Sequence, residues 1–392
     1  MLAHFIRRAA SDCVRGHARA AIASSRPTSL VADRHLDAAA SWLVRSIEAC
    51  GGVASSKGYR FMKGWMPPYP ETTGYIIPTL LALDRSRGSD KLEATALEMG
   101  RWLTGVQQPG GGFAGYELGL QSRPDVFDTG MILLGFNALI HKGEREAFLE
   151  PARKAAEFLA QSMDESGCFV RNMSHDMVHA YNVRSAWGLM AFGQLAGDRQ
   201  LINRAAACAD WTIGQQNAHG FYLQNSFKPG GNANTHGTAY VMRGLLQCHM
   251  LSGDARYLAS VKRAAAEVCR LYAREGWIAA ELGPEWQYLS SHICLTGYAQ
   301  LAIVLYRLFV MEGDAEHRRV ADLLLEDVAR HQTLDDAQPW HGGIAGSFPI
   351  WGRYAPLQYP NWATKFFVDA VLAQRHAHAG AGAWPEIELY AG

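Results

Sequence analysis

Two carboxylates in equivalent sequence contexts are the first candidates for chemistry. Glu71 stands directly before Thr72-Thr73-Gly74, and Asp128 stands directly before Thr129-Gly130. If each Thr-Gly pair opens a helix, the two acids lie at the starts of neighbouring helices, which pack roughly 8–10 Å apart. Carboxyl separations of about 5–9.5 Å serve acid/base chemistry at glycosidic bonds. Glu71 and Asp128 are therefore candidates for a paired catalytic role.

A structural role explains the same two positions. An acid just before a Thr-Gly helix start also fits helix N-capping, in which the side chain accepts backbone N–H bonds, or another purely structural hydrogen bond. The field at a helix N-terminus favours an ionised carboxylate by a few tenths to about 1 kcal/mol. Unless burial opposes this field, we expect both acids to be bases or electrostatic stabilisers, and the proton donor to lie elsewhere.

Three residues are candidates for that proton donor. His236 precedes Gly237 in the same position of its repeat, and an imidazole is the group most readily poised near neutral pH. His179 and Tyr181 belong to the string His179-Ala-Tyr-Asn-Val-Arg184, which puts an imidazole, a phenol and a guanidinium within a short stretch. Each residue also fits a purely structural role in a loop.

Aromatic and polar side chains recur in the long segments that precede these helices. Aromatic rings stack on the C–H faces of sugars, and carboxylates, amides and imidazoles pair with their hydroxyls. This mixture favours a sugar ligand. The predicted substrate-binding residues are Trp65, Tyr69, Tyr116, Arg184, Glu285, Trp286, His292, Trp351, Tyr354, Trp362 and Lys365.

Metal and cofactor motifs are absent from the sequence. The seven cysteines are scattered without a CxxC pair, so neither a zinc site nor a disulfide framework is indicated. No GxGxxG, Walker or GxSxG motif occurs in the required context. The sequence predicts no metal and no dissociable cofactor.

An internal repeat positions these residues. An aromatic or Leu late in one helix is followed by Gln and a Gly-aromatic break, as in Trp102 to Phe113, Phe158 to Phe169 and Trp211 to Phe221, with Gln107, Gln161 and Gln215. Each break leads through a polar stretch to a second, more apolar helix. These second helices are predicted to begin near Thr73, Thr129, Asn182, Gly237, Thr296 and Ala363, which are 53 to 67 residues apart.

Six such helical hairpins predict an all-α (α/α)6 toroid. The first helix of each pair is amphipathic and suits an outer ring, whereas the second is apolar nearly all round and suits an inner ring. Gly135, Gly188 and Gly244 would allow close contact between inner helices. Gly-Asp pairs such as Gly197-Asp198, Gly253-Asp254 and Gly313-Asp314 predict a C-cap followed by an N-cap.

The long loops then all meet at one mouth of the ring, which is the expected site. The toroid is expected over 34–378, with a poorly packed leader over 1–33 and a loosely ordered tail over 379–392. Short strands are expected only within loops, at 221–223 and 277–278. We expect a cytoplasmic protein without a transmembrane segment, because no apolar run approaches the roughly 18 residues needed.

Charge narrows the class of partner. Lys plus Arg and Asp plus Glu each total 37 in 392 residues, and no basic block occurs. Bulk charge therefore argues against a dedicated nucleic-acid or anionic-membrane binder.

Four phrases resemble those of a known family. They are YPETTGYIIPT from Tyr69, HAYNVRSAW from His179, CLTGYAQ from Cys294, and GSFPIWGRY from Gly346 running on to YPNWATKFF from Tyr359. Together they look like helical-toroid proteins associated with bacterial exopolysaccharide biosynthesis genes, over nearly all of 35–376. The toroid is also similar to that of terpene cyclases and prenyltransferase β-subunits, although the chain lacks their Asp-x-Asp-Asp motif. More distant relatives in fold include glucosamine epimerases and unsaturated glucuronyl hydrolases.

The resemblance implies a pathway rather than a reaction. The leading hypothesis is a carbohydrate-active protein of exopolysaccharide assembly that holds a glycan or lipid-linked oligosaccharide in the mouth and catalyses hydrolysis, epimerisation or elimination. Other proteins of polysaccharide assembly are possible partners. One alternative is an isoprenoid cyclase or prenyltransferase-like enzyme, and another is a non-catalytic glycan-binding scaffold of the synthetic complex.

Overall fold

Twelve α-helices alternate between an outer and an inner ring in the computed structural model, which describes residues 29–120 and 122–380. The outer helices are α2 (Asp33–Glu48), α4 (Glu93–Val106), α6 (Arg145–Ser162), α8 (Arg199–Gly214), α10 (Ala255–Glu275) and α12 (Ala315–Arg330). The inner helices are α3 (Pro70–Arg87), α5 (Val126–Lys142), α7 (Val183–Ala196), α9 (Thr235–Ser252), α11 (Leu295–Glu312) and α13 (Asn361–Ala379). Residues 1–28 of the predicted leader and 381–392 of the predicted tail lie outside the described residues.

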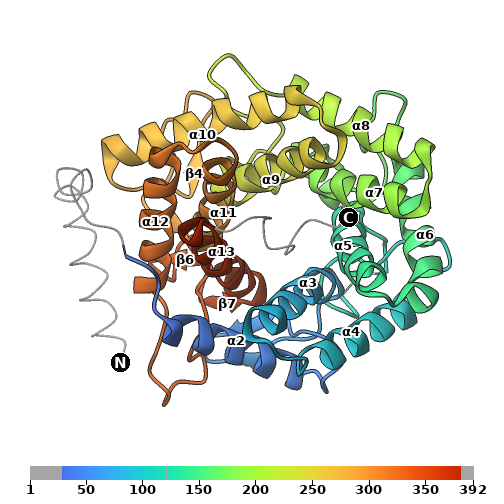
Figure 1. The fold of residues 1–392 in the computed structure, drawn as a ribbon, viewed down its shortest axis with the longest axis horizontal. Helices are drawn as coiled ribbons and strands as arrows, with labels where there is room; N and C mark the ends of the chain where they lie inside the picture. The colour runs from blue at the N-terminus through green and yellow to red at the C-terminus, as the bar shows by residue number, and fades with distance from the viewer. Residues whose placement is uncertain (1–28, 121, 381–392) are drawn as a thin grey trace.

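The predicted (α/α)6 toroid is confirmed. Figure 1 looks along the ring axis and shows α2, α4, α6, α8, α10 and α12 at the periphery, with the other six helices around the centre. Each inner helix packs on the next, and α13 packs on α2 and α3, which closes the ring. Every inner helix begins within three residues of its predicted start.

Helix ends on the side away from the long loops follow the predicted Gly-Asp pattern. Gly197, Gly253 and Gly313 adopt the left-handed conformation that ends α7, α9 and α11. The aspartate that follows each glycine accepts backbone N–H bonds from the first turn of the next outer helix, as Asp198 does from Gln200. These short turns leave the long loops on the opposite side of the ring.

Glycines bring the inner helices into backbone contact. A Cβ atom on Gly74 of α3 would lie 2.5 Å from the Ile132 Cα atom of α5, and one on Gly135 would lie 2.4 Å from the Gly74 carbonyl oxygen. A Cβ atom on Gly130 of α5 would meet Ser185 of α7 in the same way. The Thr-Gly pairs at the helix starts therefore set how closely the residues beside them approach.

In the second, fourth and sixth repeats a glutamine fastens the loop to the next outer helix. The Gln107 side chain donates to the carbonyl oxygens of Gly111, in its own loop, and Pro151, in α6. In the fourth repeat this residue is Gln216, one position after the Gln215 of the sequence repeat, and it donates to the Gly220 and Ser260 carbonyl oxygens. In the third repeat Arg204 of α8 makes the connection instead, by donating to the Ala160 and Asp164 carbonyl oxygens.

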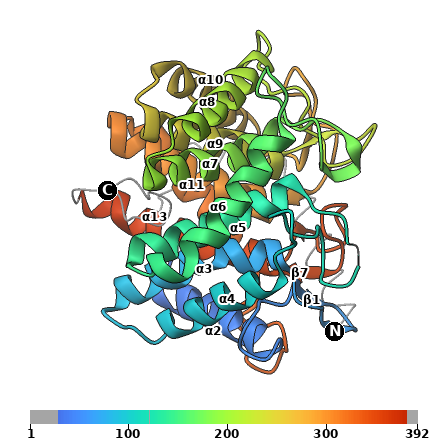
Figure 2. The same cartoon turned by 90° about the vertical axis from the view of Figure 1, so that its right-hand side faces the viewer.

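Among the described residues, three small antiparallel sheets tie the long loops together. They pair β1 (Gly58–Arg60) with β2 (Gly64–Trp65) and β7 (Gln358–Pro360), β3 (Ala233–Asn234) with β4 (Glu281–Leu282), and β5 (Ile293–Cys294) with β6 (Ser347–Phe348). The strands predicted at 221–223 and 277–278 do not form; Tyr222 makes only an isolated bridge with Gln216. Figure 2 shows β1 and β7 on the loop side of the ring.

No helix in the described part of the chain is both long and apolar enough to cross a membrane.

Candidate active site

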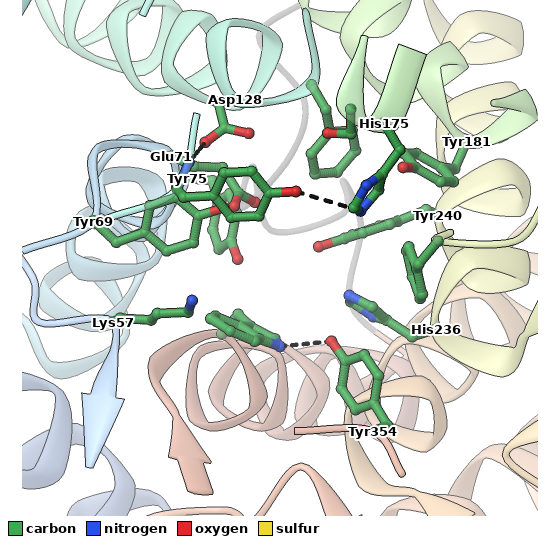
Figure 3. A pocket seen from close by; sticks show the side chains of 15 residues that line it. Lys57, Tyr69, Glu71, Tyr75, Asp128, His175, Tyr181, His236, Tyr240 and Tyr354 are labelled. Atoms are coloured by element: carbon green, nitrogen blue, oxygen red, sulfur yellow. Dashed lines mark hydrogen bonds between the residues drawn. The ribbon is translucent and has the colours of Figure 1, made fainter. Parts of the chain in front are cut away.

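A cavity of about 270 Å³ opens among the long loops, at the N-terminal ends of the inner helices. Nine of its lining residues are aromatic and six carry other polar groups. The lining residues are Lys57, Tyr69, Glu71, Tyr75, Tyr116, Phe127, Asp128, Ser174, His175, Tyr181, Phe227, His236, Tyr240, Tyr354 and Trp362. Figure 3 shows Glu71 and Asp128 on one side of the cavity and His236 and Tyr354 across from them.

The first turns of two adjacent inner helices supply the carboxyl pair. Glu71 is the second residue of α3 and Asp128 the third of α5, and both side chains are almost fully buried. Neither is a helix N-cap, so the capping interpretation was wrong: α3 begins after Tyr69, which makes no side-chain cap, and α5 is capped by Asp125. The Asp128 carboxylate instead accepts the Tyr116 backbone N–H at 3.1 Å.

Burial, rather than the helix field, controls the charge of these two groups. Desolvation raises the pKa of Glu71 from 4.5 to about 7, against the lowering effects of a Tyr69 hydrogen bond and the Lys57 and Arg184 charges. Desolvation also raises the pKa of Asp128 well above its usual value, and the neighbouring Asp125 and Glu71 carboxyls add to this. Burial therefore opposes the helix field, the exception that the sequence-based expectation allowed, and it favours the protonated form of both acids.

Asp125 is the site-supporting residue that sequence reasoning missed. Its Oδ1 atom accepts the backbone N–H groups of Phe127 at 2.7 Å and Asp128 at 3.2 Å, and its Oδ2 atom accepts the Ser174 hydroxyl at 2.7 Å. These bonds hold its oxygen atoms beside Asp128. Its place directly before the α5 run, a favoured N-cap position, was the available signal.

His236 lies on the opposite wall, in the first turn of α9. Its Nδ1 atom lies 2.6 Å from the Gln300 side-chain amide, and its backbone N–H donates to Asn234. Desolvation, with the Arg184 and Arg243 charges, lowers the pKa of His236 well below 6.5. A charged imidazolium donor at this position near neutral pH, as the sequence suggested, is thus disfavoured.

The other two predicted proton donors differ in their position. Tyr181 lines the cavity, and burial raises the pKa of its phenol well above 10. His179 does not line it, but stacks behind Tyr181 with ring centroids 4.5 Å apart. Its two ring nitrogens lie 3.0 Å from the carbonyl oxygens of Ser174 and Ser226, so it links two loops.

Of the predicted substrate-binding residues, four line the cavity: Tyr69, Tyr116, Tyr354 and Trp362. The Trp362 indole N–H donates to the Tyr354 hydroxyl at 2.8 Å, which fixes the edge of the indole. The Tyr116 hydroxyl lies 3.4 Å from His175, so the second and third long loops meet at the rim.

Two predicted residues lie buried beneath the cavity rather than in its wall. The Arg184 guanidinium packs 5.0 Å from the Tyr240 ring centroid and 5.1 Å from that of Trp187. Lys365 forms a 2.5 Å ion pair with Asp369 within α13. Burial lowers the pKa of Lys365 to about 7 despite this partner. From this position the Arg184 charge acts on the cavity, where it lowers the pKa values of both Glu71 and His236.

The remaining five predicted residues lie away from the cavity. Trp65 packs on Trp42 with ring centroids 5.1 Å apart, and the buried Trp286 donates its indole N–H to the His219 carbonyl. His292 is buried near Gly352, whereas Glu285 and Trp351 are exposed. Residue type and loop membership alone did not separate these five from the true lining.

Seven lining residues were not predicted: Lys57, Tyr75, Phe127, Ser174, His175, Phe227 and Tyr240. Helical spacing was the available signal for two of them. Tyr75 follows Glu71 by four residues and Tyr240 follows His236 by four, so each lies one turn deeper on the same helix face. Lys57 is held at the rim by a 2.7 Å ion pair with Glu117.

Within the described ranges, no cluster of three or more His, Cys, Asp or Glu side chains is arranged to hold a metal ion.

Comparisons with known proteins find similarity in solved structures alone. No protein-family model matches the chain, and no curated protein sequence matches it. An unsaturated glucuronyl hydrolase specific for heparin matches with a TM-score of 0.69 at 15% identity, over 88% of this chain and 97% of its own. The unsaturated glucuronyl hydrolase of Bacillus sp. GL1 has the same TM-score at 16% identity, over 87% and 96%. Cellobiose 2-epimerase of Bacillus thermoamylovorans gives 0.68 at 10%, over 86% and 98%.

At these identities the likeness shows the (α/α)6 toroid fold.

Proposed function

We propose that this protein is a carbohydrate-active enzyme that hydrolyses a glycosidic bond in the loop-side cavity, with Asp128 and Glu71 as its acid and base. The observation that carries the proposal is the pair of buried carboxyls on adjacent inner helices, both with a raised pKa and facing one aromatic-lined cavity. Most glycoside hydrolases use two carboxyl groups with different proton affinities.

Each residue of the pair has a distinct role. Burial beside Asp125 and Glu71 favours the protonated form of Asp128, which would donate its proton to the leaving glycosidic oxygen as the C–O bond breaks. Glu71, with a pKa of about 7 and the Lys57 and Arg184 charges nearby, is ionised in a substantial fraction of molecules and would act on the anomeric carbon or on the attacking water. The water supplies the hydroxyl and proton that complete the two products.

The rest of the lining suits a sugar. Trp362 and the tyrosines provide flat apolar faces together with hydroxyl groups, and His175, Ser174 and Lys57 add hydrogen-bonding groups at the rim. The cavity volume of about 270 Å³ lies just below the roughly 300–1,000 Å³ of ligand sites, which favours a short sugar segment over a long chain. The resemblance in fold to glucuronyl hydrolases and an epimerase supports the same substrate class.

The isoprenoid alternative receives less support from the lining. Six of the nine aromatic lining residues are tyrosines, and a lysine, a serine and two histidines accompany them. A hydrocarbon chain leaves these hydrogen-bonding groups unpaired, which costs binding free energy.

The place of this reaction in the cell rests on sequence alone. The four phrases that resemble exopolysaccharide-associated toroid proteins support a role in exopolysaccharide assembly in the cytoplasm, on a glycan or a lipid-linked oligosaccharide. Other assembly proteins are then the natural partners.

A glycan-array screen with the full-length protein, followed by mass spectrometry of incubated hits, tests the proposal. We expect wild type to bind and cleave a hit, giving products whose summed mass exceeds the substrate by one water. Asp128→Asn should bind the same glycan without cleaving it. An isomer of unchanged mass would refute hydrolysis in favour of epimerisation, an unsaturated product would indicate elimination, and binding without turnover by wild type would indicate a scaffold.

A further inference from the structure

A chain of three buried side chains leads from the centre of the ring to the His236 imidazole. Arg243 of α9 donates from Nη1 to the Gln300 Oε1 atom of α11 at 2.9 Å, and Gln300 Nε2 lies 2.6 Å from His236 Nδ1. The exposed fractions are 1%, 0% and 3% for Arg243, Gln300 and His236, so water does not compete for these contacts.

The chemistry of the donors fixes the direction of this chain. A guanidinium can only donate hydrogen bonds, so the Gln300 atom that it contacts must be the amide oxygen. The amide nitrogen, which also only donates, therefore faces His236. Nδ1 must accept with its lone pair, and the single proton of the neutral imidazole is then on Nε2.

We propose that Gln300 is a positioning residue that holds His236 in the Nε2–H tautomer, so that His236 serves the cavity as an uncharged hydrogen-bond donor to a substrate oxygen. The cavity surrounds His236 on its other side, where Phe227 and Tyr354 flank the ring. Figure 3 shows a ring nitrogen of His236 directed toward the space between it and the carboxyl pair. A fixed neutral donor stabilises developing negative charge without having to lose or gain a proton.

The surroundings of His236 favour its neutral form. Arg184 of α7 and Arg243 of its own helix are cations, and Cys294 and the phenols of Tyr240 and Tyr354 are uncharged near pH 7. Burial and the two arginines lower the pKa of His236. Among the described residues around this ring, the structure gives no carboxylate contact that would retain a second proton.

The tautomer is testable without any substrate, whereas the donor role rests on the proposed function. In full-length protein labelled with ¹⁵N-histidine, the His236 signals are identified by their loss in His236→Asn. We expect an unprotonated Nδ1 and a protonated Nε2, unchanged between about pH 6 and pH 8. A protonated Nδ1 in wild type, whether from the other tautomer or from an imidazolium, would overturn the proposal.

Two glutamine variants separate positioning from packing. Gln300→Glu replaces the donating amide by an accepting carboxylate and should move the proton to Nδ1 or create an imidazolium. Gln374→Leu removes an equally buried glutamine that bonds Asp322 on α12, and should leave the His236 signals unchanged. Unaltered His236 signals in a folded Gln300→Glu protein would refute the positioning role. If this variant fails to fold, the wild-type spectrum still tests the proposal, because a protonated Nδ1 overturns it.

Activity supplies the second readout. On a glycan found by the screen, Gln300→Leu should lower kcat by about tenfold with little change in KM, the effect of misdirecting one hydrogen bond. If wild type shows the Nε2–H tautomer but Gln300→Leu leaves kcat unchanged, the donor role is refuted and the tautomer assignment stands. Failure to find any cleaved glycan would count against the proposed function and leave the tautomer result standing.

Discussion

Replacing Glu71 by glutamine should stabilise the fold at neutral pH while it removes activity. The carboxyl is buried, and desolvation raises its pKa from 4.5 to about 7. Below about pH 4.5 the group is protonated in both folded and unfolded chains and imposes no penalty. Between pH 4.5 and about 7 the unfolded chain loses this proton while the folded one keeps it, so stability falls as pH rises through this window.

The size of the effect follows from the same values. At 1.36 kcal/mol per pKa unit, the difference between 4.5 and about 7 corresponds to about 3 kcal/mol at and above neutral pH. Glutamine avoids this cost but adds an N–H₂ group, and leaving it unpaired costs about 1 kcal/mol. The net gain is about 2 kcal/mol, which for a chain of this length raises Tm by roughly 3 °C.

Thermal unfolding of both proteins across a pH series measures this gain. Near pH 4.5 the variant should be slightly less stable than wild type, because the unpaired N–H₂ group costs about 1 kcal/mol and the burial penalty that offsets it at higher pH is nearly absent. The full gain should appear above about pH 7, and turnover should fall about 10²–10⁴-fold. Glu285→Gln, at an exposed position in another long loop, is the matched control and should change neither quantity. A Glu71→Gln protein that is less stable than wild type at pH 7, or a gain independent of pH, would refute the reasoning.

Three further predictions concern the acid, the aromatic wall and the ring itself. Asp128→Asn should lower kcat about 10²–10⁴-fold with glycan affinity preserved; an equal loss of affinity measured by calorimetry would contradict its role as the acid. Trp362→Ala should weaken glycan binding by about tenfold or more, whereas Trp351→Ala, at an exposed position outside the cavity, should not. Gly74→Ala should lower Tm by several degrees because its Cβ atom would lie 2.5 Å from the α5 backbone, and Gly105→Ala, with open space around it, should raise Tm slightly. Equal Tm values for the two glycine variants would show that the α3–α5 contact does not constrain the ring.

The ring was predictable because its signals are local and repeated. Apolar periodicity, Gly-Asp turns and the six-fold recurrence each depend on residues close together in the chain, and together they located every inner helix start to within three residues. The same repeat puts all the long loops on one side of the ring, and the cavity lies on that side. Short strands were misplaced because their pairing joins distant loops, as β1 pairs with β7 across about 300 residues.

The composition of the cavity was only partly predictable. Glu71, Asp128 and His236 were identified by their place at helix starts, and the cavity brings them together. Trp286 and His292 were included because of their type, but they pack into other parts of the loops. Loop sequence shows which side chains reach the mouth side, whereas their orientation depends on backbone contacts between loops.

The sequence by itself determined the twelve-helix toroid and the side on which its site lies, since both follow from periodic patterns. Only the tertiary structure decided the protonation of the site. Close packing of α3 and α5 buries Asp128 beside Asp125 and Glu71, and this raises the pKa of Asp128 and favours its protonated form. The neutral tautomer of His236 depends on Gln300, 64 residues later in the chain. Desolvation and hydrogen bonding depend on distance in space, which no spacing along the sequence encodes.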